Sequence, residues 1–436
     1  MIVVNEHYGF KEERSLLNLS EEQINLLQQQ NFAQHFCRSK KDEQLCYAIN
    51  YNEIENKYHL NSSYIVGLHW VVKGKLPIYI KPKLNNENEE VDYLKMLFEA
   101  LKEIENIGHL DNLYQIDFNA PLIEIEQQQD ILSPLLIIEF LTVLKQIVKK
   151  GLKKSYYNVT KNLNTRVKGK VLVNATVKKN HTKAKFQYNY CKYQEFGYNS
   201  IENRLLKKTL EFARAVISNH KSLATENVQQ LFNYITPAFT NVSSEINLKE
   251  VNNFKHNPFF KEYKNAVQIA KIILKRYAYN ISQVSDKKYK TPPFWIDMPK
   301  LFELYLFKKL KEVFPLRNEV LYHQKFNSLE PDILLNSKVN DKEYKVIIDA
   351  KYKPRYEEGV ISHTDAAQVS GYGRLKSIRN KFQTEDNDLL IDTLIIFTSN
   401  SSQNKEIIKE NLLANEDKRY HKLFKYSLQI PKIKEF

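Results

Sequence analysis

The chain has 436 residues, of which 42% are hydrophobic and 12% aromatic, so it can fill the cores of two or three domains and is not a largely disordered protein. Lys and Arg outnumber Asp and Glu by 65 to 51, and the resulting net charge of +14 favours a polyanionic partner. The three cysteines are too few for a disulfide framework and lack the CxxC spacing of zinc sites, which favours a reducing compartment.

No segment predicts export or a membrane span. Acidic residues occupy the N-terminus, where a signal peptide needs an apolar stretch. The most apolar window, residues 131–148, is interrupted by Pro134, Glu139 and Lys145, so we expect a buried helix there. We therefore expect a soluble, cytoplasmic protein without membrane contacts.

Residues 1–130 are predicted to form an N-terminal β-rich domain. Its β-branched and aromatic runs, bounded by polar turns, predict strands at Ile2–Val4, Tyr64–Leu68 and Leu76–Ile80. The polar, acidic residues 85–90 predict a solvated loop, and the apolar spacing of Tyr93–Ile104 predicts a helix.

Residues 131–285 are predicted to form a basic, mainly helical middle region. Apolar residues recur at helical spacing in several segments. The predicted helices are Leu132–Leu152, Ser200–Asn219, Val228–Tyr234 and Tyr263–Tyr277. Between them, the β-branched segment Gly169–Val177 predicts a strand.

A long basic run lies inside this middle region. Residues 140–190 contain thirteen Lys or Arg and no Asp or Glu. A solvated basic face has this composition, and so does a surface that contacts phosphates, and the residues alone leave both interpretations open. The candidate DNA-binding residues are Lys168, Lys170, Lys178 and Lys179.

Residues 286–436 are predicted to form a third domain, since charges and two prolines at 285–293 mark a boundary. Its elements are a helix at Met298–Val313, strands at Asn318–Phe326, Pro331–Leu335 and Tyr344–Tyr352, a helix at His363–Ile378, and a strand at Thr393–Ser399. The order is αβββαβ. The expected fold class is therefore α+β and multidomain: a β-rich N-terminal domain, a helical middle region and a C-terminal α/β core.

Three residues in this core point to metal-dependent chemistry. Asp332 opens one apolar strand, and Asp349 and Lys351 lie two apart on another, so the latter two share a face. Two carboxylates and an ammonium group beside a sheet core cost on the order of several kcal/mol unless a cation compensates them. Mg²⁺, with Mn²⁺ as a substitute, prefers such oxygen ligands, and the lysine can orient or help deprotonate an attacking water and offset charge in the transition state.

Further candidates flank this set. Glu303 is a charged residue within the apolar helix at 298–313, and Gln368 and Tyr372 lie four apart on the next helix, hence on one face. Each of these residues is also compatible with an ordinary helix surface. An aspartate and a lysine two apart are common on surface strands, but the full ordered set favours a site.

Pro331-Asp332 followed by Asp349-Ala350-Lys351 resembles the PD-(D/E)xK nuclease superfamily, and Gln368…Tyr372 is similar to the QxxxY element of its RecB-like branch. The resemblance implies that the αβββαβ core holds a metal. The implied metal contacts are Asp332, Asp349, Glu303 and the backbone carbonyl of Ala350. It also implies a catalytic role for Lys351, together with Asp332, Asp349, Glu303, Gln368 and Tyr372.

Segments outside this core resemble McrC-type proteins, the cleavage subunits of McrBC modification-dependent restriction systems. They are VGLHWVVKGKLPIYIKPK (66–83), KGKVLVNATVKKN (168–180) and YNSIENRLLKKTL (198–210). This resemblance implies an Mg²⁺-dependent endodeoxyribonuclease that cuts modified double-stranded DNA. It also implies a hetero-oligomer with an AAA+ GTPase of the McrB type, on which the N-terminal domain docks.

The sequence agrees that nucleotide hydrolysis belongs to a partner. No GxxxxGK[ST] motif occurs, since Gly74-Lys75 and Gly169-Lys170 lack both the upstream glycine and the following Ser or Thr. Two alternatives stay open: a non-catalytic, DNA-binding subunit that activates its partner and has a vestigial nuclease fold, and a stand-alone restriction or repair nuclease. The intact set of Asp332, Asp349 and Lys351 argues against the first.

Overall fold

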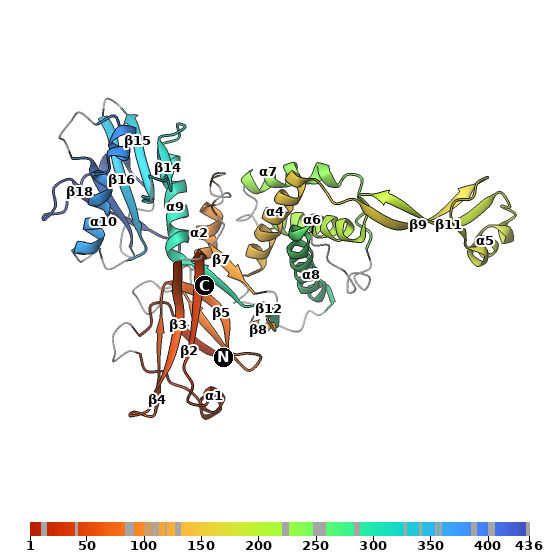
Figure 1. Ribbon diagram of the computed structural model, residues 1–436, viewed down its shortest axis with the longest axis horizontal. Helices are drawn as coiled ribbons and strands as arrows, with labels where there is room; N and C mark the ends of the chain where they lie inside the picture. Colours follow the sequence, from red (N-terminus) through yellow and green to blue (C-terminus); the bar gives the residue numbers. More distant parts are fainter. Residues whose placement is uncertain are drawn as a thin grey trace. The chain divides into compact units, whose positions relative to one another are not determined.

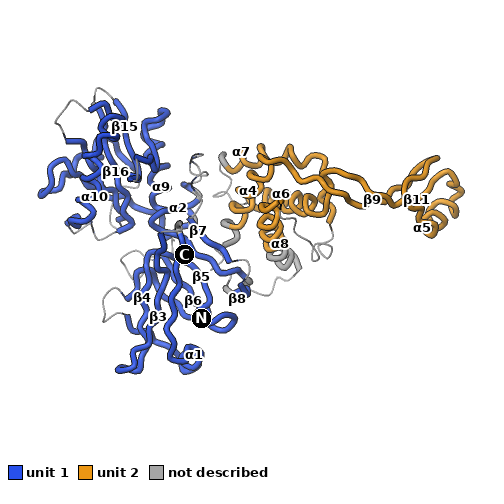
Figure 2. The backbone as a smooth tube through the Cα atoms, in the orientation of Figure 1, with its two compact units in different colours: residues 1–124, 290–436 blue, residues 125–289 orange. Residues whose placement is uncertain are grey.

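The computed structural model describes residues 1–9, 15–39, 42–82, 91–100, 103, 105, 109, 113–117, 120–126, 132–219, 226–246, 259–282, 288–326, 329–339, 342–353, 356, 360–384, 390–399 and 406–432. The loop expected at 85–90 lies outside these residues. Contacts divide the chain into unit 1, residues 1–124 with 290–436, and unit 2, residues 125–289 (Figure 2). The first and third predicted segments thus belong to one compact unit. Strands β8 (Ile123–Glu126) and β12 (Lys288–Thr291) pair where the chain passes between the units.

The N-terminal part of unit 1 contains two sheets. The antiparallel sheet β2-β3-β4 consists of Phe32–Ser39, Asp42–Asn52 and Lys57–Ser62. The second sheet has the order β1-β6-β5-β13-β7 and consists of Ile2–Asn5, Leu76–Lys81, Ile65–Val72, Phe294–Asp297 and Tyr114–Ile116. The predicted strands at 2–4, 64–68 and 76–80 are confirmed, whereas the sheet β2-β3-β4 is not predicted from the sequence.

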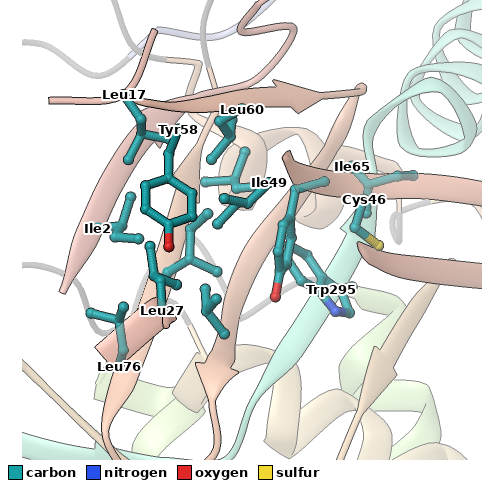
Figure 3. Packing of buried hydrophobic residues seen from close by; sticks show 14 of the residues in the cluster. Ile2, Leu17, Leu27, Cys46, Ile49, Tyr58, Leu60, Ile65, Leu76 and Trp295 are labelled. Atoms are coloured by element: carbon teal, nitrogen blue, oxygen red, sulfur yellow. The ribbon is translucent and has the colours of Figure 1, made fainter. Parts of the chain in front are cut away.

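One apolar core joins these elements (Figure 3). It contains Ile49 and Leu60 from the smaller sheet, and Leu27 from helix α1 (Glu21–Leu27), which begins with a capping box at Ser20. It also contains Trp295 of β13, which comes from the last third of the sequence. The N-terminal and C-terminal segments of the chain therefore share this core.

Strand β13 leads directly into the C-terminal core. It lies between β5 and β7, antiparallel to both, and its last residue, Asp297, caps helix α9 (Met298–Val313) by accepting a hydrogen bond from the backbone N–H of Lys300. Helix α9 has the predicted bounds. It packs on helix α2 (Tyr93–Ala100). Helix α2 confirms the helix predicted at Tyr93–Ile104 as far as Ala100.

The C-terminal core has the sheet order β14-β15-β16-β17-β18. Its elements after α9 are β14 (Val320–Tyr322), β15 (Ile333–Val339), β16 (Lys342–Lys351), α10 (His363–Gly373), α11 (Lys376–Lys381), β17 (Asp392–Ser399) and β18 (Leu423–Gln429). Strands β14, β15 and β16 pair antiparallel, whereas β17 pairs parallel with both β16 and β18. The predicted order αβββαβ is present. The helix predicted at 363–378 is wrong in one respect, because it breaks at Arg374 into two helices.

Unit 2 is a helical bundle from which a long β-ribbon projects (Figure 1). Helix α4 packs on α7 and α8, and α6 packs on α8. The helices are α4 (Leu132–Lys150), α6 (Ile201–Asn219), α7 (Glu226–Ile235) and α8 (Lys261–Ser282), so all four predicted helices are confirmed. In the described ranges, no helix is long and apolar enough to cross a membrane.

The ribbon, which we call the arm, spans residues 155–197. It pairs β9 (Ser155–Asn164) with β11 (Tyr188–Gly197), and carries β10 (Lys170–Val171) and helix α5 (Val173–Lys179) near its tip (Figure 1). The strand predicted at Gly169–Val177 is therefore wrong beyond its first residues. The buried hydroxyl of Thr176 accepts a hydrogen bond from Tyr190 N–H, which anchors the helix on β11 and overrides the β-branched composition.

Candidate active site

Asp349 and Lys351 lie at the end of β16 and point to one face of the sheet. The same alternation places Ile347 on this face, where it joins a buried cluster with Ala366 and Val369 of α10. Asp349 is 1% exposed, and its Oδ2 lies 2.9 Å from Nζ of Lys351. Its Oδ1 has no hydrogen-bond partner among the described residues. Burying a carboxylate in this way costs free energy, which a bound cation would offset.

Asp332 lies opposite Asp349 across the two strands. Ile333 pairs with Ile348 in the antiparallel register. Asp332, just before Ile333, therefore lies opposite Asp349, just after Ile348. The backbone N–H of Ala350 donates a hydrogen bond of 2.9 Å to Oδ2 of Asp332. The strand pairing therefore brings together two carboxylates that are 17 positions apart in the sequence.

Glu303 of α9 forms a cluster with Asp332 and His323. One ligand atom each from Glu303, His323 and Asp332 lies within 4.8 Å of the other two. Oε2 of Glu303 accepts a hydrogen bond of 3.2 Å from the hydroxyl of Tyr322 and lies 3.2 Å from Nε2 of His323. A divalent ion and two of its ligands fit within such spacing, because each ligand lies about 2.0–2.6 Å from the ion.

Lys351 is held by residues of helix α10. Its Nζ donates a hydrogen bond of 3.1 Å to Oε1 of Gln368, whose Nε2 lies 3.4 Å from the hydroxyl of Tyr372. Nζ also lies 3.7 Å from Oδ1 of Asp365. The lysine is thus oriented by Asp349 on its own strand and by three side chains connected through the facing helix.

Asp365 is the centre of a second small network beside the lysine. Both of its oxygens accept hydrogen bonds from Lys353, at 3.3 and 3.0 Å, and its Oδ2 also accepts one from the hydroxyl of Tyr356. Burial acts to raise the pKa of Asp365, but the hydrogen bonds from Tyr356 and Lys353 outweigh it and lower the pKa. Asp365 therefore stays ionised next to Lys351.

The electrostatics of the carboxylates follow from burial. Burial raises the pKa of Asp349 to about 6, although Lys351 acts in the opposite direction. Burial also raises the pKa of Asp332, and the charges of Glu303 and Asp349 add to this effect. For Lys351, burial acts to lower the pKa, but the neighbouring Asp349 outweighs it and raises the pKa. Carboxyl groups that ionise reluctantly in the metal-free protein ionise readily beside a divalent ion, so the electrostatics suit a metal.

The structure brings together the site residues predicted from the sequence: Glu303, Asp332, Asp349, Ala350, Lys351, Gln368 and Tyr372. Sequence analysis does not identify His323 or Asp365. His323 directly follows the three-residue strand β14. Its only sequence signal is a histidine a few residues before Pro331-Asp332. Asp365 lies in the first turn of α10 after the N-cap Ser362. Acidic residues are common at this position of any helix, so the sequence does not mark Asp365 as a site residue.

The four candidate DNA-binding lysines lie on the arm in unit 2, and all are exposed. Nζ of Lys168 lies 4.3 Å from the ring centre of Tyr193, and Nζ of Lys179 lies 5.0 Å from that of Tyr190. Lys170 and Lys178 are the other two. The arm therefore carries ammonium groups over aromatic rings, together with exposed aromatic side chains such as Phe186 and Phe196.

A family model described as "McrBC 5-methylcytosine restriction system component" matches residues 64–391. The chain belongs to the McrBC restriction family. The match extends across both units and includes every candidate residue of the C-terminal core, so the predicted resemblance is confirmed at the level of the family.

Two solved structures are similar to the chain at low levels. One is a refined half-complex from the tetradecameric assembly of Thermococcus gammatolerans McrB AAA+ hexamers with bound McrC, at 16% identity and a TM-score of 0.33, covering 86% of this chain and 78% of that one. The other is the cryo-EM structure of the Thermococcus gammatolerans McrBC complex, at 14% identity and a TM-score of 0.28, covering 73% and 89%. No protein of curated function matches the chain.

Proposed function

We propose that this chain is the DNA-cleaving, McrC-type subunit of a modification-dependent restriction system. The observation that carries the proposal is the grouping of Asp332, Asp349 and Lys351 at adjoining ends of β15 and β16, with Asp349 buried and its Oδ1 without a hydrogen-bond partner among the described residues. The element order around it supports a PD-(D/E)xK core, and the family match supports the system.

Asp332, Asp349, Glu303 and the backbone carbonyl of Ala350 are the groups that would hold Mg²⁺, with Mn²⁺ as a substitute. When bound, such an ion supplies Lewis-acid polarisation of the phosphate and lowers the pKa of a coordinated water. The carboxylates would hold the ion, and Asp349 and Gln368 hold Lys351 next to them. We therefore assign Lys351 to orienting water and offsetting negative charge.

Gln368 and Tyr372 act on the lysine in this proposal. The amide oxygen of Gln368 accepts a hydrogen bond from Lys351, and its amide nitrogen donates one to the hydroxyl of Tyr372. Both side chains also offer hydrogen bonds to a phosphate or a water on the same face. Their substitution is therefore expected to lower the turnover rate more than the metal affinity.

Cleavage of modified double-stranded DNA by the full chain with its GTPase partner tests this proposal. Asp349→Asn and Lys351→Ala are each expected to lower the rate by about 10²-fold or more, because they remove a metal ligand and the positioned cation. Lys345→Ala is the matched control, since this lysine lies on the same strand but pairs with Glu343 at its start. Undiminished cutting by folded Asp349→Asn protein would show the assignment to be wrong.

The partner proposed is an AAA+ GTPase of the McrB type. The match to the McrBC restriction family motivates it, and the sequence has no phosphate-binding loop of its own. We assign docking to the N-terminal domain, residues 1–130. Co-purification of the full chain with such a GTPase is the expected result, whereas cleavage by this chain alone would favour a stand-alone nuclease.

A second candidate function rests on the arm. Its exposed lysines and aromatic rings favour contact with a polyanion, so we assign Lys168, Lys170, Lys178 and Lys179 to DNA binding. Charge reversal of all four should weaken DNA binding and flatten its salt dependence. In the alternative of a non-catalytic activator, the arm would bind DNA normally while the core showed no affinity for Mg²⁺ or Mn²⁺, so metal titration separates the two functions.

A further inference from the structure

His323 lies among the carboxylates of the candidate metal site. Its Nε2 is 3.2 Å from Oε2 of Glu303, and its Nδ1 is 3.4 Å from Oε1 of Glu330. A ligand atom of His323 lies within 4.8 Å of one from Glu303 and one from Asp332. One ring nitrogen therefore faces the position that the carboxylates surround, while the other faces an acid outside it. Metal-binding histidines commonly show this arrangement, because the second acid fixes the tautomer and the ring orientation.

The backbone also holds the ring in place. The N–H of His323 donates a hydrogen bond of 2.9 Å to the carbonyl of Asp332, so the histidine and the aspartate are tied together directly. His323 has a φ of 46°, in the left-handed region that residues other than glycine rarely adopt. The ring of Tyr322 packs on the imidazole, with ring centres 4.2 Å apart.

The buried Asp349 gives an independent indication that a cation belongs here. It is 1% exposed and its Oδ1 has no hydrogen-bond partner among the described residues. It faces Asp332 across the strand pair, and Asp332 belongs to the same cluster as His323. The donor set around Asp332 therefore contains oxygens from several carboxylates and one imidazole nitrogen.

We propose that His323 supplies a nitrogen ligand to the divalent metal held by Glu303 and Asp332, so that the site favours Mn²⁺ over Mg²⁺. The inference rests on the metal site of the proposed function and adds a ligand to it. Mg²⁺ takes oxygen ligands almost exclusively. Mn²⁺ also favours oxygen ligands and is the weakest binder of the divalent first-row series, but as a transition metal it accepts an imidazole nitrogen more readily than Mg²⁺ does. The competing explanation is that His323 only holds Glu303 by an ion pair, and in that case no nitrogen would contact the metal.

Pulsed electron paramagnetic resonance on the full chain with one equivalent of Mn²⁺ separates these explanations. Spin-echo modulation detects nitrogen bound directly to Mn²⁺, and labelling with ¹⁵N-histidine assigns that nitrogen to a histidine without any substitution. His323→Asn should remove the signal, and asparagine is a suitable replacement because it tolerates the left-handed conformation. His109→Asn is the matched control: its ring lies 4.8 Å from that of Tyr322 but belongs to no cluster identified among the described residues.

We expect His323→Asn to weaken Mn²⁺ binding on the order of tenfold and to change Mg²⁺ binding by less than about threefold. Mn²⁺ binding that depends on Asp332 but shows no nitrogen modulation would overturn the inference and leave the proposed nuclease intact. The same holds if the modulation survives in folded His323→Asn protein. If Mn²⁺ binding is absent, or unaffected by Asp332→Ala, both the inference and the proposed metal site are wrong.

Discussion

The hydroxyl of Tyr352 donates a hydrogen bond of 2.8 Å to Oε1 of Glu6, 346 positions earlier in the chain. Both residues are buried. Tyr352 directly follows Lys351, and its ring packs edge-on against Tyr64 and lies near Phe302 of α9. Residues of the N-terminal domain therefore hold the end of β16 in place through Tyr352. The position of Lys351 depends in this way on the packing of that domain.

Tyr352→Phe should destabilise unit 1 by about 1–3 kcal/mol, because it removes one donor from a buried carboxylate and keeps the ring contacts. Chemical denaturation of the wild-type and variant chains measures the difference. Tyr156→Phe is the control, since the Tyr156 side chain is exposed on the arm and should have no effect. Equal stability of wild type and Tyr352→Phe would show that the contact with Glu6 contributes nothing.

Asp365→Asn tests the network that holds Lys351. The substitution removes an ionised carboxylate 3.7 Å from the lysine and leaves α10 intact, so we expect cleavage to fall by about 10–100-fold in kcat. Asp365 does not belong to the metal cluster identified among the described residues, so Mn²⁺ affinity should stay within a small factor of wild type.

Asp392→Asn is the matched control for this substitution, since Asp392 also pairs with a lysine, Lys422, but at the opposite end of β17. It should leave the turnover rate unchanged. A parallel loss of kcat and of Mn²⁺ affinity in Asp365→Asn would instead indicate general damage to the site.

The C-terminal core follows closely from the sequence because its signals are local. Helix α9 begins at Met298 with Pro299 in its first turn, and it is apolar and buried on nearly every side. Strand β17 contains the apolar run Leu394–Phe397, and β16 contains the shorter run Val346–Ile348, as expected for strands covered on both faces. The strand period of two is sufficient to place Asp349 and Lys351 together.

The features that the sequence does not give depend on tertiary contacts. The arm strand β9 is exposed along most of its length and rich in Asn, so the alternation of Tyr157, Val159 and Leu163 with polar residues is too weak to predict a strand. The approach of His323 to Glu303 depends on a left-handed residue and on the pairing of β14 with β15. The sharing of one core between the N-terminal sheets and Trp295 requires β13 to insert between β5 and β7, which no local pattern specifies.

Gly67→Ala tests the pairing that joins these distant segments. A Cβ at Gly67 would lie 2.1 Å from the carbonyl oxygen of Phe294, so β5 and β13 would have to separate. We expect a loss of at least about 2 kcal/mol in the free energy of unfolding, measured by denaturant titration. Gly371→Ala is the control: nothing lies within 4 Å of its added Cβ on α10, so it should be neutral or stabilise by up to about 1 kcal/mol. A Gly67→Ala protein as stable as wild type would contradict the close approach.

His69 makes the stability of unit 1 depend on pH. Its ring stacks on Trp295 at 5.7 Å, and burial lowers its pKa below the ordinary 6.5, although the carbonyl of Trp70 acts to raise it. In the unfolded chain His69 gains a proton as the pH falls through 6.5, whereas in the folded protein it does not until a lower pH. Unit 1 is therefore most stable above pH 6.5, and it loses stability as the pH falls from 6.5 towards the lower pKa of folded His69, at a rate of at most about 1.4 kcal/mol per pH unit.

His69→Phe keeps the stacking and removes the titration, so its unfolding free energy should fall less steeply than that of wild type as the pH drops from 7 to 5. Denaturant titrations of the metal-free chain across this range measure the two slopes. Tyr156→Phe, which changes an exposed aromatic ring on the arm, should keep the wild-type slope. Identical slopes for wild type and His69→Phe would mean that the folded protein protonates His69 as readily as the unfolded chain does, and that its packing against Trp295 is loose enough to admit water.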